Sequence, residues 1–395
     1  GGNKSIQVKK GHLFLVLIST FFVNFDSALI IPIIANYAIS LGASIILASV
    51  IVGIYSLFHI PSNIFLGRLI DKFGRKGFLI LGIFLDGLAM LFYYLAFDPY
   101  FLLFARILHG IGGGFGGPAT MSYLADSFSN KKSGRSMAFY GISVGFSMLL
   151  GVMIGGILAS SIGYQNIFLI IAVVMFFISL FCFTLPVIYE PPKIKSKLKE
   201  ELKVFKNIIT NKNFITPYLS LFAAFFNLGI LTANYTVYLK NNNYSDAQIG
   251  MILGIAVIFS ILMNYPAGKF SDKFGKLKFI YIGLVFCSVG FVILLISPFS
   301  LFPYLGMMIY GLGQGMIFPV SASIVKDRSN KENRGIATGL YYALNVGGIA
   351  IGAPISGTVT ELSGFFGGIF LGVIVPLIVF FLIFFLRVES AKEPN

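Results

Sequence analysis

Charged residues are scarce in this sequence. Only 11% of its 395 residues are charged and 57% are apolar, whereas soluble domains carry about 25% charged residues. Such a chain cannot cover itself with a surface suited to water and needs lipid as part of its solvent. Trp is absent, so Tyr and Phe must supply any aromatic belt at the membrane interface. The two cysteines, Cys182 and Cys287, lie in apolar runs and fit packing residues, which argues against a disulfide or a metal site.

Motifs of enzymes and cofactor sites are also missing. The sequence has no H-E-x-x-H, no G-x-S-x-G and no P-loop. Residues 112–117 fit G-x-G-x-x-G, but they lie inside an apolar run with no strand before them, so the dinucleotide reading fails. The net charge of +14 has no soluble basic face to present to nucleic acid. We therefore expect neither an enzyme nor a nucleic-acid-binding protein, and no cofactor or resident metal.

Long apolar runs dominate what is present. A run of roughly 20 residues can cross a bilayer as a helix. The first run is too long for a signal peptide and has no cleavage signature. The sequence thus predicts an all-α integral membrane protein with twelve transmembrane helices, near residues 12–37, 45–67, 77–97, 100–124, 136–160, 165–187, 213–240, 247–269, 278–297, 301–325, 335–360 and 364–387.

Basic residues gather on one side of this predicted topology. When successive loops are assigned to alternate sides, all but two of the 29 Lys and Arg residues share the side that holds both termini. The exceptions are Lys240, on the other side, and Arg106, inside a run. This asymmetry predicts that both termini are cytoplasmic, in a multi-pass protein of the plasma membrane. The basic loops would also contact anionic lipids.

The two halves of the chain repeat each other. An offset of 201 residues relates glycine, proline and aspartate positions along most of each half, among them Gly67 and Gly268, Asp71 and Asp272, Gly74 and Gly275, Pro118 and Pro319, and Asp126 and Asp327. With six spans in each half the repeat is parallel, and a solute site near the midplane between the halves is expected. We divide the chain into bundles at 1–187 and 213–395.

Residues 188–212 connect these bundles. Apolar residues in this segment recur on one helical face, with lysines between them: Ile194, Leu198, Leu202, Phe205 and Ile209. This pattern favours an amphipathic helix lying on the cytoplasmic interface over a solvated linker.

Two aspartates and one arginine lie well inside predicted spans, where charge is costly and marks function. At a rise of about 1.5 Å per residue, Asp26 lies roughly 21 Å from the inner boundary, and Arg106 lies at a similar depth. Asp86 lies at roughly 14 Å by the same measure, so we expect Asp26 to be the partner of Arg106. Asp86 either faces a neighbouring helix in protonated form or is a second coupling site.

A short loop carries a resemblance to a known family. Residues 67–76, Gly-Arg-Leu-Ile-Asp-Lys-Phe-Gly-Arg-Lys, resemble the G-x-L-x-D-R-x-G-R-K loop of the major facilitator superfamily, and residues 268–276 are a weaker second copy. With twelve spans and a duplicated half, the resemblance covers nearly the whole chain. It implies two six-helix bundles that carry a small solute by alternating access.

The resemblance also assigns gating roles. Asp71 would accept from the N-terminus of the eleventh span, and Arg75 would pair with Asp126 when the cytoplasmic side is closed. The second copy would contribute in the same way. The resemblance therefore implies gating by Gly67, Asp71, Gly74, Arg75, Asp126, Gly268, Asp272, Gly275 and Asp327.

Residues 106–110, Arg-Ile-Leu-His-Gly, resemble the R-x-x-x-G motif of proton-coupled members of that superfamily, most of all the twelve-span drug:proton antiporters. A cationic solute or a conformational change would displace Arg106, and Asp26 would then take a proton. The register equivalent of Asp26 is Asn227, so the first half should carry protonation. A permanent structural ion pair is the alternative.

The drug-exporter motif G-P-x-x-G-G is incomplete here, because Val152 replaces its proline. Proton-coupled export of hydrophobic or cationic compounds is the first reading. A facilitator or symporter for a sugar, an organic anion or an amphiphile is the second, with Arg106 binding the solute's negative charge.

A monomer with protons, lipids and a small solute as partners is expected. Polar residues expected in the solute cavity are His59, His109, Tyr140, Asn227, Asn234, Asn264, Tyr310, Gln314, Tyr341 and Asn345; the two histidines are equally read as proton relays or packing residues.

Overall fold

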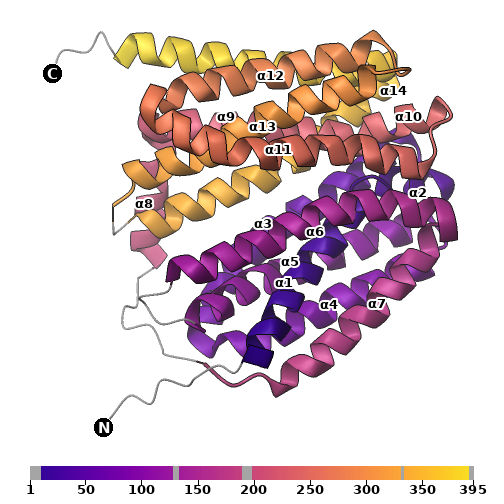
Figure 1. Cartoon of the computed structure of the whole chain (residues 1–395), viewed down its shortest axis with the longest axis vertical. Coiled ribbons are helices and arrows are strands. Elements are labelled where there is room, and N and C mark those ends of the chain that lie inside the picture. The colour runs from indigo at the N-terminus through magenta and orange to yellow at the C-terminus, as the bar shows by residue number, and fades with distance from the viewer. Residues whose placement is uncertain (1–9, 128–132, 189–197, 331–332, 391–395) are drawn as a thin grey trace. The chain divides into compact units, whose positions relative to one another are not determined.

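The computed structural model describes residues 10–127, 133–188, 198–330 and 333–390, and every regular element in these ranges is a helix (Figure 1). The chain divides into two compact units. Unit 1 comprises Gly1–Ala43, Ile54–Ile194 and Ser245–Gly250, and unit 2 comprises Ser44–Gly53, Lys195–Tyr244 and Met251–Asn395.

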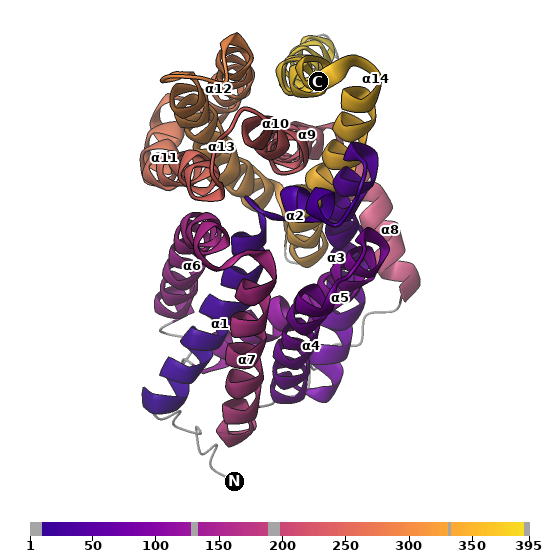
Figure 2. The same cartoon turned by 90° about the vertical axis from the view of Figure 1, so that its right-hand side faces the viewer.

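Unit 1 holds the helices of the first half. They are α1 (Lys10–Ile30), α2 (Ile34–Ser40), most of α3 (Ile45–Phe73), α4 (Arg75–Leu95), α5 (Pro99–Asp126), α6 (Ser133–Ile162), α7 (Tyr164–Phe181) and the 3₁₀ turn η2 (Cys182–Thr184). Within the unit, α1 packs along α6, and α4 packs against both α5 and α7 (Figure 2). Small residues make these contacts close: a Cβ on Gly82 would lie 2.4 Å from the backbone N of Gly116, so α4 and α5 touch through their backbones.

Unit 2 holds the helices of the second half. They are α8 (Leu198–Thr210), α9 (Lys212–Ile230), the π-helical segment η3 (Leu231–Tyr235), α10 (Thr236–Asn241), most of α11 (Asp246–Phe274), α12 (Lys276–Ile296), α13 (Phe302–Arg328) and α14 (Arg334–Ser390). Here α9 packs along α14, while α12 packs against α13 and α14. These contacts match those of α1 with α6, and of α4 with α5 and α7.

The repeat seen in the sequence reappears in the backbone. Helices α3 and α11 begin and end 201 residues apart, and so do α4 and α12. Gly163, between α6 and α7, has φ +80°, and its register equivalent Gly364 has φ +82° and interrupts α14 at the corresponding point. Because side chains rarely adopt such φ values, glycine is needed where each pair of helices is joined.

The first helix of each half is also irregular at matching positions. In the first half, α1 ends at Ile30 and a turn that includes Pro32 leads into α2. Pro32 has no N–H to continue the helical ladder. In the second half, η3 widens the helix over Leu231–Tyr235, and this range contains the register equivalent of Pro32, Ala233, although no proline is present there. The predicted span 12–37 is therefore two helices, whereas the span 213–240 is one continuous helix with a π-helical segment inside it.

Ten helices of the described residues are long and apolar enough to cross a membrane. One of them is Ile336–Leu386, which spans 51 residues and contains the break at Gly364. Helix α5, which carries Arg106, is not among the ten. The chain is thus a multi-pass, all-helical protein, and the count of twelve spans stays a prediction.

Helix α8 lies in the segment between the two halves and has two apolar faces. Ile208 is 2% exposed and packs with Phe214 and Tyr218 in a hydrophobic cluster of unit 2. Leu202 and Ile209, from the face noted in the sequence, are exposed at 58% and 48%. One face therefore fixes the helix to unit 2, and the other is open to an apolar phase such as lipid.

Candidate functional site

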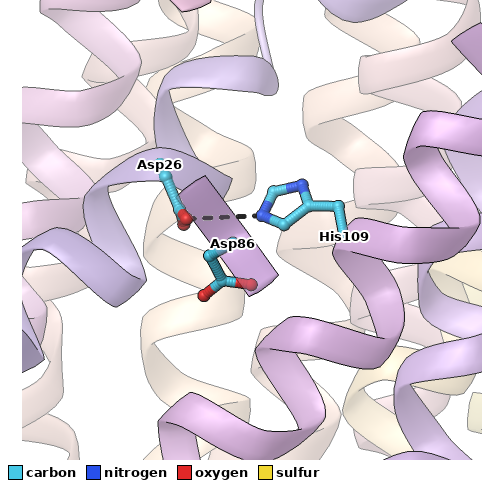
Figure 3. A group of neighbouring side chains, drawn as sticks. All are labelled: Asp26, Asp86 and His109. Atoms are coloured by element: carbon cyan, nitrogen blue, oxygen red, sulfur yellow. Dashed lines mark ion pairs between the residues drawn. The ribbon is translucent and has the colours of Figure 1, made fainter. Parts of the chain in front are cut away.

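The centre of the candidate site is a contact between α1 and α5 inside unit 1. Nε2 of His109 lies 3.4 Å from Oδ2 of Asp26, an ion pair when the imidazole is protonated (Figure 3). Both residues are fully buried. A buried carboxylate is costly unless it is paired or protonated, so this position is suited to a group that exchanges protons.

Tyr93 of α4 links this pair to the arginine. Its hydroxyl lies 3.0 Å from Nδ1 of His109, and Nη1 of Arg106 donates to it at 3.5 Å. Asp26 is thus connected to Arg106 through an imidazole and a phenol. The sequence predicted a direct partnership of Asp26 and Arg106, and the structure brings both into one cluster by way of His109 and Tyr93.

Helix α3 forms a wall of the cluster. The ring of Tyr55 lies 4.7 Å below the guanidinium carbon of Arg106, a cation–π distance, and stacks on His59 with ring centroids 5.3 Å apart. The hydroxyl of Ser27 donates to Oδ1 of Asp26 at 3.1 Å and lies 3.2 Å from the Tyr55 hydroxyl. Arg106 therefore has an aromatic face and a phenol oxygen to stabilise its charge, and it is only 6% exposed.

Asp86 of α4 completes the cluster. A carboxyl oxygen of Asp26, a carboxyl oxygen of Asp86 and a ring nitrogen of His109 all lie within 4.8 Å of one another. Figure 3 shows Asp86 next to the other two side chains. Asp86 is fully buried, and neither of its carboxyl oxygens has a hydrogen-bond partner among the residues that the structure describes.

The depth estimate from the sequence was wrong about Asp86. It separated Asp86 from Asp26 by several ångströms along the membrane normal, but the structure places them side by side. That estimate treated every helix as straight, perpendicular to the membrane and starting at its predicted boundary. Helix α4 begins at Arg75, earlier than the predicted 77, and helices in bilayers tilt by about 20° on average.

Two carboxylates and an imidazole are also donors that a divalent metal could use. Arg106 lies in the same cluster, however, and its fixed positive charge disfavours a divalent cation beside it. The absence of a resident metal stays a prediction.

Several polar residues expected to line a solute cavity join helices of unit 2 instead of being free. Asn227 donates to the Gly372 carbonyl at 2.9 Å, and Asn234 donates to Ser356 at 2.5 Å. The Tyr310 and Tyr341 hydroxyls donate to backbone carbonyls at 2.8 and 2.6 Å. The amide of Asn264, turned to satisfy its neighbours, reaches the Gly315 and Ser260 carbonyls at 3.1 Å each. Gln314, Asn345 and Tyr140 are half-buried. Binding of solute by any of them stays a prediction.

The expected gating residues are described in part. The surroundings of Gly67 and the side chains of Asp71 and Asp126 lie outside what the structure describes. In the second copy, Lys276 pairs with Asp327 across α12 and α13 and lies 3.4 Å from Asp272. Lys276 and Asp327 are the register equivalents of Arg75 and Asp126, which are expected to pair in the first copy.

The family model of the Major Facilitator Superfamily matches residues 16–241 and 217–395. The chain belongs to this superfamily. Among curated relatives, an uncharacterized MFS-type transporter of Methanocaldococcus jannaschii is 27% identical over 362 residues, covering 89% of this chain and 92% of that protein. The multi-drug resistance efflux pump PmrA homolog of Lactococcus lactis is 28% identical over 379 residues, covering 91% of each. The multidrug resistance protein MdtG of Escherichia coli is 26% identical over 373 residues, covering 88% of each.

Solved structures share the fold of this superfamily member. A bacterial homolog of the human lysosomal transporter Spinster, in an inward-facing and unoccupied conformation, has a TM-score of 0.82 at 14% identity over the whole of both chains. The nucleoside transporter NupG has a TM-score of 0.79 at 14% identity, covering 97% of this chain and 100% of that one. Its membership of the Major Facilitator Superfamily makes the chain a membrane transporter for a small molecule, in a family of transporters and not of enzymes, in the plasma membrane.

Sequence reasoning missed Tyr93 and Tyr55, although a signal was present. Tyr93 follows Asp86 by seven residues, and His109 follows Arg106 by three, so each pair shares one helical face. A search for polar residues on the same face of each apolar run would have added Tyr93 to the candidates, but it would not have shown which helices meet or included Tyr55.

Proposed function

We propose that this chain is a proton-coupled antiporter that exports small hydrophobic or cationic compounds by alternating access. The observation that carries the proposal is the link from Asp26 through His109 and Tyr93 to Arg106. Burial disfavours the charged form of a carboxyl group and a nearby cation favours it, so a change in the position of the cation can couple to proton binding. The multidrug names of MdtG and of the PmrA homolog support the choice of cargo.

In this proposal the chain crosses the membrane twelve times with both termini in the cytoplasm. Adding α5 to the ten candidate spans, and counting the two pieces of α14 separately, gives this number. The functional unit is a monomer. Residues 1–187 and 213–395 form the two bundles, joined by residues 188–212, and the first bundle carries the proton site.

Proteoliposomes with and without an imposed pH gradient test the proposal. One lipophilic cation, tetraphenylphosphonium, and one organic anion, benzoate, serve as cargo. The wild-type protein should move the cation faster when protons flow down their gradient in the direction opposite to that of the cation. Asp26→Asn should reduce that transport to the rate seen without a gradient, because the side chain no longer titrates. Glu361→Gln, which neutralises an exposed carboxylate, is the matched control.

A facilitator or symporter for an anionic or neutral solute is the second candidate, because a buried guanidinium such as Arg106 can bind a carboxylate or phosphate. Two results together would favour this second candidate over the antiporter. Benzoate uptake would be the same in Asp26→Asn and wild type, and cation transport would not respond to the pH gradient.

A further inference from the structure

Asp86 has a space made for it by glycine. A Cβ on Gly112 of α5 would lie 2.5 Å from its Oδ1, and a Cβ on Gly116 would lie 3.6 Å from its Oδ2. Any larger residue at Gly112 would collide with the carboxyl group. At the neighbouring Gly87, α4 meets the apolar residues Met175 and Phe176 of α7. The backbone of α5 thus admits a carboxyl group to the interior of unit 1 but supplies it with no described hydrogen-bond donor.

The charges around Asp86 can be counted element by element. Asp26 comes from α1, Arg106 and His109 come from α5, and Tyr93 comes from α4 itself, all in one buried cluster. Helix α3 adds the phenol of Tyr55 and the imidazole of His59. With neutral histidines and tyrosines, two ionised carboxyls against one guanidinium leave one negative charge without compensation. Two neighbouring carboxyls in a space of low dielectric cannot both ionise at low cost.

One proton restores neutrality to the cluster. It balances the second carboxyl while Arg106 balances the first. We infer that Asp26 and Asp86 hold a single proton between them, so that the coupling acid of this carrier is a carboxyl pair and not Asp26 alone. This inference rests on the proposed function and refines its site.

The pair also specifies the charge of the cargo. When the proton leaves to water, the cluster keeps two carboxylates and one guanidinium, and its net charge is one negative unit. A cargo with one positive charge restores the balance, so one proton exchanges for one monovalent cation. A dication or an anion would leave the cluster charged in the loaded state, at a high cost inside the bundle.

Infrared difference spectroscopy tests the shared proton without any cargo. The carbonyl stretch of a protonated carboxyl group is separate from that of a carboxylate. At neutral pH the wild-type protein should show a buried protonated carboxyl that both Asp26→Asn and Asp86→Asn remove, because in each variant Arg106 balances the one remaining carboxylate. If the signal survives in either variant, one aspartate holds the proton alone and the inference is wrong.

A glycine pair keeps the test independent of whether Asp86→Asn folds. Gly112→Ala retains both aspartates but displaces the Asp86 carboxyl, whereas Gly117→Ala is on the same helix with no atom within 4 Å of the added Cβ. The pH at which the infrared signal of the protonated carboxyl group is half lost should shift by about one pH unit in Gly112→Ala. The same midpoint should not change in Gly117→Ala. An unmoved midpoint in folded Gly112→Ala overturns the inference.

Transport separates this inference from the proposed function. Suppose that Asp26→Asn and Asp86→Asn both lose the infrared signal but the wild type shows no gradient-driven transport. This result supports the shared proton and refutes the proposed antiport. Gradient-driven transport that Asp26→Asn abolishes and Asp86→Asn leaves unchanged supports the antiporter and refutes the pair.

Discussion

The imidazole Nε2 of His109 lies 3.4 Å from Oδ2 of Asp26, and both side chains are buried. His109 also lies 3.0 Å from the Tyr93 hydroxyl through its other ring nitrogen. The ring therefore joins the acid of α1 to the phenol of α4 and lies on the route from Asp26 to Arg106.

We expect His109→Ala to reduce pH-gradient-driven transport in proteoliposomes by about tenfold or more. A hydrogen bond to a charged group contributes about 1.5–3 kcal/mol, and 1.4 kcal/mol corresponds to a factor of ten. Transport down the cargo's own gradient should fall less, because it does not need protonation. His12→Ala, at the start of α1, should behave like the wild type. Equal driven transport in His109→Ala and wild type would remove His109 from the proton path.

In the proposed carboxyl pair, Arg106 is the positive charge that balances one carboxylate. Replacing it with Gln should destabilise the protein in detergent by about 3–5 kcal/mol at neutral pH, the usual cost of leaving a buried charge without its partner. The loss should shrink as the pH falls, because protonated carboxyls need no counter-charge. Arg106→Lys should recover only part of the stability, since Lys lacks the planar group that faces the Tyr55 ring.

Thermal unfolding of purified Arg106→Gln and wild type across a range of pH measures this effect. Gln314→Ala, a change to a half-buried polar residue of unit 2, gives the cost of an ordinary substitution inside a helix. If the difference between Arg106→Gln and wild type is the same at every pH, the arginine does not balance a titrating carboxyl.

The repeat could be recognised in the sequence because the repeated residues are ones that the structure needs for a particular backbone conformation or charge. Gly74 and Gly275 both have left-handed φ values, at +97° and +102°, where α3 meets α4 and α11 meets α12. Such positions tolerate little besides glycine, so the offset of 201 residues remains visible when the apolar residues around them differ.

The candidate site was predictable only in part. Asp26 and Arg106 were found because charge inside an apolar run is conspicuous. Their connection was not, because it runs through Tyr93, and tyrosine is an ordinary residue of membrane helices. The place of Asp86 depends on how closely α4 approaches α5 at Gly82 and Gly112, which is a property of packing and not of depth along the sequence.

Close helix contacts in unit 2 predict a second stability difference. A Cβ on Gly311 of α13 would lie 2.3 Å from the carbonyl oxygen of Ala256 in α11, so Gly311→Ala must push these helices apart. Overpacking of this kind costs about 1–3 kcal/mol. Gly339→Ala, which has nothing within 4 Å of the new Cβ, should be neutral or slightly stabilising. The apparent melting temperatures of the two variants in the same detergent check the prediction, and equal values would mean that α11 and α13 are less tightly packed than described.

The pair of Lys276 and Asp327 predicts a modest, salt-dependent coupling. The side chains are 21% and 56% exposed, and Ser323 also accepts from Lys276. Exposed pairs contribute about 0.2–1 kcal/mol, so a double-mutant cycle of Lys276→Ala and Asp327→Ala should give a coupling free energy in this range. The coupling should decrease in 1 M salt, where the Debye length is about 3 Å. The same cycle on Arg75 and Asp126 should give a similar value, because these residues occupy the same register in the first half. A coupling free energy near zero for the first-half pair, beside a measurable one for Lys276 and Asp327, would show that the two copies of the loop have diverged in function.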